Sequence, residues 1–131
     1  MTRPRYDNHS TEFGLWLRGQ KRIDSKLGFV ATNLDYIWTN YKTGFWMMLE
    51  EKRYKSSLTF SQRQQFQILD KAARSDPRYK GFHKIVFEHT SPDDGRIALN
   101  NKIVTVDELL EFLCFKRIEV GCLPEVTHAR R

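Results

Sequence analysis

Three charged residues in the first half of the chain have the types and spacing of a divalent-metal site. Asp35 lies within a run of aromatic and branched residues, and Glu50 and Lys52 end a second such run. Acidic residues are poor strand formers, so their presence in two segments that favour strands suggests a function. Mg²⁺ prefers hard oxygen ligands and keeps several waters, so one or two carboxylates usually suffice. With a lysine to orient the attacking water, such a group fits the hydrolysis of phosphodiester bonds.

Two predicted strands would position these side chains. Residues 29–39 (FVATNLDYIWT) and 45–52 (FWMMLEEK) suit a pleated surface, and the short loop between them ends in a glycine. We therefore predict an antiparallel hairpin. A period of two places Glu50 and Lys52 on one face and the Glu51 side chain on the other. Because neighbouring strands lie about 5 Å apart, Asp35 and Glu50 converge if the register permits.

The remaining elements follow from periodicity and turn signals, and together they predict an α/β (α+β) fold in a single domain over residues 1–131. Residues 1–9 are predicted to form a flexible arm, and residues 119–131 a loosely ordered tail. The predicted helices are residues 11–21, a second one from 59 or 61 to 76, and 107–115; the further strands are 82–90 and a small hairpin of 96–100 and 102–105.

Composition limits the function classes further. The 131 residues carry a formal charge of +6, which is compatible with nucleic-acid binding. Cys114 and Cys122 match neither a zinc motif nor a disulfide framework, which favours a reducing compartment. The N-terminal residues lack the apolar core of a signal peptide, and no stretch is apolar enough to span a membrane. We therefore expect a cytoplasmic protein with no membrane partner.

The acidic residues also resemble a family signature. Asp35, followed after 14 residues by Glu50-Glu51-Lys52, is similar to the D…(D/E)xK motif of the PD-(D/E)xK nuclease superfamily, although Leu34 replaces the proline or aspartate that often precedes the first acid. That superfamily includes restriction endonucleases and Holliday-junction resolvases. The resemblance covers residues 10–90. It implies a restriction endonuclease-like core, a central mixed sheet flanked by helices in αβββαβ order, here with an extra C-terminal hairpin and helix.

The resemblance also implies a role for each matching residue. Asp35, Glu50 and the backbone carbonyl of Glu51 would bind Mg²⁺ or Mn²⁺, and Lys52 would assist the nucleophilic water. Many members add a catalytic glutamate from the first helix, and Glu12 is placed to match. The implied substrate is DNA, with RNA as the alternative. Small nucleases of this type often act as homodimers, but no residue here decides the oligomeric state.

Basic and amide side chains around the motif are the candidates for contacts with nucleic acid. A glutamine in the second helix is frequent in the family, and Gln62, Gln64 and Gln65 are all placed to supply it. The run 52–55, KRYK, leaves the predicted site directly; it is either a solvated loop or a phosphate-contacting flank. The candidate nucleic-acid-binding residues are Arg18, Lys21, Arg22, Arg53, Lys55 and Gln65.

Simpler interpretations compete with this one. Asp35 and Lys52 can form a structural salt bridge, and Glu12 can be an ordinary acid of a first helical turn. The spacing of His83 and His89 suits no zinc site, and the tryptophans and phenylalanines are expected in the core. Three functions therefore remain open: a metal-dependent nuclease, a non-catalytic nucleic-acid-binding or assembly protein with the same fold, and an interaction protein without a nucleic-acid role.

Overall fold

The computed structural model describes residues 11–29, 31–54 and 56–123. They form an α+β structure with five strands in one mixed sheet. The chain divides into two compact units, Met1–Asn33 and Leu34–Arg131. The predicted flexible arm, Lys55 and the end of the predicted tail lie outside the described residues. Within the described part of the chain, no helix has the length and apolar character needed to cross a membrane.

The first unit contains one short helix and two single turns. Helix α1 (Glu12–Arg18) begins where the Thr11 hydroxyl accepts a hydrogen bond from the Gly14 N–H, at 3.0 Å. It stops three residues earlier than predicted, because Gly19 caps it and the following residue is extended. The 3₁₀ turns η2 (Lys21–Ile23) and η3 (Ser25–Leu27) follow.

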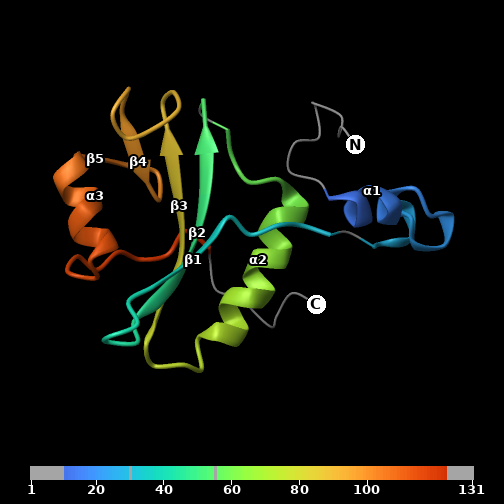
Figure 1. Ribbon diagram of the computed structural model, residues 1–131, viewed down its shortest axis with the longest axis horizontal. Helices are drawn as coiled ribbons and strands as arrows, with labels where there is room; N and C mark the ends of the chain where they lie inside the picture. Colours follow the sequence, from blue (N-terminus) through green and yellow to red (C-terminus); the bar gives the residue numbers. More distant parts are fainter. Residues whose placement is uncertain (1–10, 30, 55, 124–131) are drawn as a thin grey trace, which may run out of the picture. The chain divides into compact units, whose positions relative to one another are not determined.

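The second unit is built on a sheet whose strands lie in the order of the chain. Helix α2 (Phe60–Ala73) connects the parallel pair β2 and β3, and all other neighbouring strands are antiparallel. Figure 1 shows α2 and α3 (Val106–Leu113) on opposite sides of the sheet. The strands are β1 (Tyr36–Thr39), β2 (Trp46–Arg53), β3 (Tyr79–Phe87), β4 (Ile97–Leu99) and β5 (Lys102–Val104).

The predicted antiparallel hairpin is confirmed, but its first strand is shorter than predicted. Strand β1 begins at Tyr36, opposite Leu49, so the described residues 29 and 31–35 of the predicted strand 29–39 do not belong to it. Among the described residues, only β1 and β2 precede α2, whereas the αβββαβ order requires three strands there. Residues 29 and 31–35 have no partner strand in the described part of the chain. Their backbone N–H and C=O groups therefore form no strand ladder.

Two hydrophobic clusters hold the second unit together, one on each face of the sheet. Alternate residues of β2 enter different clusters, as a period of two requires: Met47 and Leu49 pack on the α3 side, and Met48 packs on the α2 side. The α3-side cluster is Met47, Leu49, Ile85, Ile97, Leu99, Val104, Leu109 and Phe112. The α2-side cluster is Met48, Leu58, Phe66, Phe82 and Leu123.

The prediction that the aromatic residues form the core is only partly correct. Phe66 and Phe82 are fully buried, and their rings stack with centroids 4.7 Å apart. Phe60 and Trp38 are exposed instead. Phe60 is the first residue of α2, one position after the Thr59 cap, and precedes the buried stripe of the helix. Trp38 lies on the edge strand β1 and donates its indole N–H to the carbonyl of Leu113, at 2.8 Å.

The turn at Asn100 is hydrogen-bonded to strand β3 and to the segment at Val120. Asn100 and Asn101 have φ angles of 51° and 72°, as the predicted hairpin between β4 and β5 requires. The Asn100 side chain accepts from the Lys84 N–H and donates to His83 Nδ1, both at 2.9 Å, and it donates to the Val120 carbonyl at 3.0 Å. The first residues of the predicted tail are therefore bonded to the sheet.

Candidate active site

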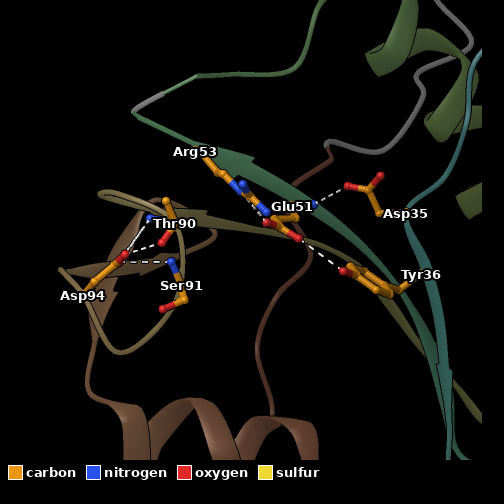
Figure 2. A network of polar contacts seen from close by, with 7 residues as sticks. All are labelled: Asp35, Tyr36, Glu51, Arg53, Thr90, Ser91 and Asp94. Carbon is orange, nitrogen blue, oxygen red and sulfur yellow. Dashed lines mark hydrogen bonds and ion pairs between the residues drawn. The ribbon is translucent and has the colours of Figure 1, made fainter. Parts of the chain in front are cut away.

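Asp35 and Glu50 meet at the end of the β1–β2 ladder. The Asp35 N–H donates to Glu50 Oε1 at 3.1 Å, and the Glu51 N–H donates to Asp35 Oδ2 at 2.9 Å. Figure 2 shows the Asp35 carboxylate directed at the β2 backbone. Beyond the last backbone pair of β1 and β2, the two carboxylates thus accept the hydrogen bonds that backbone carbonyls accept within the ladder. Because the carboxylate occupies this position, Asp35 leaves the regular ladder and β1 begins one residue later.

The Glu51 side chain lies on the opposite face of the sheet, as predicted. It accepts from the Tyr36 hydroxyl at 3.2 Å and pairs with Arg53 Nε at 2.8 Å, as Figure 2 shows. The backbone groups of Glu51 point in another direction from its side chain. The N–H and the C=O of one strand residue point to the same neighbouring strand. Since the Glu51 N–H meets Asp35, its carbonyl oxygen faces the side on which Asp35 lies.

Lys52 lies on the same face as Glu50 and is held from two sides. Its Nζ is 3.9 Å from Glu50 Oε2 and donates to Gln62 Oε1 at 3.0 Å. The same Gln62 oxygen accepts from the Thr59 N–H in a capping box at the start of α2. Of the three predicted glutamines, Gln62 is therefore the one bonded to Lys52. This amide positions the ammonium group beside Glu50.

Glu50 has the most perturbed environment of this group. Its residue is 3% exposed, and burial raises the pKa of its carboxyl from 4.5 to about 7. The negative charge of Asp35 acts in the same direction, whereas the N–H of Asp35 and the ammonium group of Lys52 favour ionisation of Glu50. A carboxyl with a pKa near neutrality in a site of converging polar groups is typical of functional positions.

The donor set fits a hard divalent cation. Asp35, Glu50 and the Glu51 carbonyl offer only oxygen, and Mg²⁺ binds such ligands while keeping part of its water shell. Across residues 11–29, 31–54 and 56–123, no three side chains from His, Cys, Asp and Glu are grouped to hold a metal ion. The two carboxylates thus satisfy the minimum requirement of Mg²⁺ but not that of an all-protein cage.

Lys84 belongs to the same face of the sheet and was not among the predicted site residues. It lies opposite Glu50 in the parallel register of β2 and β3 and is only 9% exposed. No carboxylate of the described residues forms an ion pair with it. In the sequence, Lys84 alternates with Phe82 and Val86, so it is a lysine between two apolar residues of one strand face. This pattern could have identified Lys84 as a candidate site residue.

The other predicted residues are distributed over both units. Helix α1 and turn η2 carry Glu12, Arg18, Lys21 and Arg22, all exposed, in the first unit. Their roles stay predictions. In the second unit, Arg53 pairs with Glu51, and Gln65 is half-buried on α2.

The comparisons with known proteins give no relative. No protein-family model, curated protein or solved structure matches this chain.

Proposed function

We propose that this protein is a divalent-metal-dependent nuclease that hydrolyses phosphodiester bonds of DNA. The observation that carries the proposal is the reciprocal bonding of Asp35, Glu50 and the Glu51 backbone, with Lys52 held on the same face by Gln62. Two carboxylates and a backbone carbonyl are suitable ligands for Mg²⁺ or Mn²⁺. A positioned lysine next to them is suited to orient water or to stabilise charge on phosphate.

Each residue has a defined part in this proposal. Asp35, Glu50 and the Glu51 carbonyl would hold the metal ion, which supplies Lewis acidity and lowers the pKa of a bound water. Lys52 places a positive charge where the phosphate enters, and Gln62 keeps that charge in position. Burial of Glu50 excludes bulk water from this side of the site and strengthens the electrostatic interactions there.

The order of elements supports the same proposal at the level of the fold. A hairpin that carries the acids is followed by a helix and then by a strand parallel to β2, a sequence that agrees with the last four elements of the αβββαβ order. The restriction endonuclease-like core is proposed on this ground and on the Glu50-Glu51-Lys52 signature. The described residues lack one strand of that core.

The proposal is tested by cleavage of a mixed set of single-stranded, duplex and branched DNA in Mg²⁺ or Mn²⁺. We expect Asp35→Asn and Lys52→Ala to lower the cleavage rate by about 100-fold or more. The amide of Asp35→Asn can still accept from the Glu51 N–H, so this variant removes the charge and retains the contact. Glu51→Gln is the matched control, because it removes a neighbouring charge from the other face.

Two further measurements separate loss of function from loss of structure. Circular dichroism spectra of the three variants should match the wild type, and titration calorimetry should detect Mn²⁺ binding to the wild type and to Glu51→Gln but not to Asp35→Asn. Cleavage that is unchanged in both Asp35→Asn and Lys52→Ala would refute the nuclease proposal.

A non-catalytic nucleic-acid-binding protein with the same fold is the second candidate. It is favoured by the raised pKa of Glu50, because a carboxyl that is partly protonated near pH 7 is a weaker metal ligand. This function predicts DNA binding that weakens with rising salt, because binding to phosphates releases counterions, and it predicts no cleavage with any divalent metal.

A further inference from the structure

Two exposed aromatic residues belong to the segments that carry Lys52 and its partner Gln62. Tyr54 follows Lys52 by two residues and is 64% exposed, and Phe60 is 74% exposed. Phe60 begins α2, two positions before Gln62, which bonds Lys52. Both rings belong to the second unit and stand at the segments that position the candidate site. Neither residue belongs to the two hydrophobic clusters of the second unit.

The charge around these rings indicates an anionic partner. The sequence from Lys52 to Leu69 contains basic residues but no aspartate or glutamate. Arg63 is exposed one turn into α2, and no carboxylate of the described part of the chain pairs with it. Exposed aromatics within a basic segment are the arrangement by which proteins bind single-stranded nucleic acid, with cations on the phosphates and rings on the bases.

The backbone at Tyr54 adds a second argument. Tyr54 has a φ of 56°, in the left-handed region that a bulky residue rarely adopts. Its N–H donates to the Phe87 carbonyl at 3.0 Å, so this backbone position is fixed to β3. A strained conformation persists where surrounding contacts require it, and such residues cluster at sites of function. Here the strained residue carries an exposed ring and follows Lys52 by two positions in the chain.

We propose that Tyr54 and Phe60 stack on unpaired bases, and that the substrate therefore has a single-stranded stretch at the candidate site. In duplex DNA the faces of the bases are covered by their neighbours, so exposed rings have nothing to stack on unless the bases separate. Stacking tolerates any base, so the surface selects strand state and not sequence. This inference deepens the proposed nuclease function and rests on it for the position of the substrate.

Binding in EDTA tests the inference without any cleavage. Fluorescence anisotropy is measured with a labelled 20-nucleotide single strand and with the same sequence as a blunt duplex. We expect the wild type to bind the single strand more tightly. Tyr54→Asn and Phe60→Ala should each weaken single-strand binding by about 5- to 150-fold, the range measured for loss of one stacked base, and should change duplex binding by less than about 2-fold.

The variants are chosen to separate stacking from other effects. Asparagine accepts a left-handed backbone readily, so Tyr54→Asn removes the ring without adding strain, and Tyr54→Phe should retain binding. Tyr41→Ala is the matched control, because Tyr41 is 89% exposed in the loop that precedes β2, at the opposite end of the strand from Lys52. It should leave binding unchanged.

The outcomes distinguish this inference from the proposed function. Single-strand binding that is unaffected in Tyr54→Asn and Phe60→Ala, or that falls equally for single strand and duplex, overturns the inference even if the wild type cleaves DNA. A selective loss of single-strand binding supports the stacking surface even if no metal supports cleavage.

Discussion

Replacing Glu50 by glutamine tests the physical state of the candidate site directly. Glu50 is buried, and the pKa of its carboxyl is raised from 4.5 to about 7. Below pH 4.5 the carboxyl is protonated in both the folded and the unfolded chain, so its burial has no charge penalty. Between pH 4.5 and 7 the unfolded chain loses this proton while the folded chain keeps it, so stability falls as the pH rises.

The size of the effect follows from the two pKa values. At 1.36 kcal/mol for each pH unit between them, the wild type loses about 3 kcal/mol of unfolding free energy by pH 8.5 when no metal is present. Glutamine does not titrate, and its amide oxygen can still accept from the Asp35 N–H. We therefore expect Glu50→Gln to be more stable than the wild type at pH 8.5 and similar to it at pH 4.5.

Urea unfolding followed by tryptophan fluorescence in EDTA measures both proteins at the two pH values. Glu51→Gln should keep the pH dependence of the wild type, because Glu51 lies on the other face with Arg53. Mg²⁺ at 100 times its dissociation constant should then restore about 2.7 kcal/mol to the wild type at pH 8.5 and much less to Glu50→Gln. An identical pH dependence in the wild type and Glu50→Gln would refute this reasoning.

Three further predictions concern residues of the sheet around the site. Burial lowers the pKa of His83 from its ordinary 6.5, so its contribution to stability is complete above pH 6.5 and is lost as the pH falls. Glu50 acts in the opposite direction over part of this range, so the His83 effect is measured as a difference between variants. In thermal melts between pH 8 and 5, His83→Gln should gain stability relative to the wild type as the pH falls, whereas the difference between His89→Gln and the wild type should stay constant. Lys84→Met removes a buried charge without an ion-pair partner among the described residues, and should raise the free energy of unfolding by about 1 kcal/mol or more. A lower free energy of unfolding for Lys84→Met than for the wild type, measured by urea unfolding, would contradict this prediction. Asn100→Ala removes three hydrogen bonds and places alanine at a φ of 51°, and should cost about 2–4 kcal/mol in the same assay.

Much of the local structure could be predicted from the sequence, because it depends on neighbours in the chain. The turn at Asn100 and Asn101 requires residues that tolerate a positive φ, and the second helix, predicted to start at 59 or 61, begins directly after Thr59. Alternation along β2 likewise separates Glu50 and Lys52 from Glu51. These predictions are confirmed because a period of two and a short turn need no knowledge of distant segments.

The limits of β1 could not be predicted in this way. Residues 29–39 have strand-like composition throughout, but a strand exists only where a partner supplies hydrogen bonds. Of the described residues 29 and 31–39, only 36–39 pair with β2. The exposure of Phe60 and Trp38 was missed for a related reason. Hydrophobicity favours burial, but whether a given ring finds a surface to pack against depends on where its helix begins or its strand ends.

The candidate site shows the same division. Residue types and a period of two are enough to indicate which acids and which lysine suit a metal site, and to place Glu50 and Lys52 on one face. Only the tertiary structure decided that Asp35 bonds the β2 backbone, that Gln62 and not its neighbours holds Lys52, and that Lys84 lies opposite Glu50. These contacts depend on strand register and on the position at which α2 packs on the sheet, and both are set by the burial of the two hydrophobic clusters.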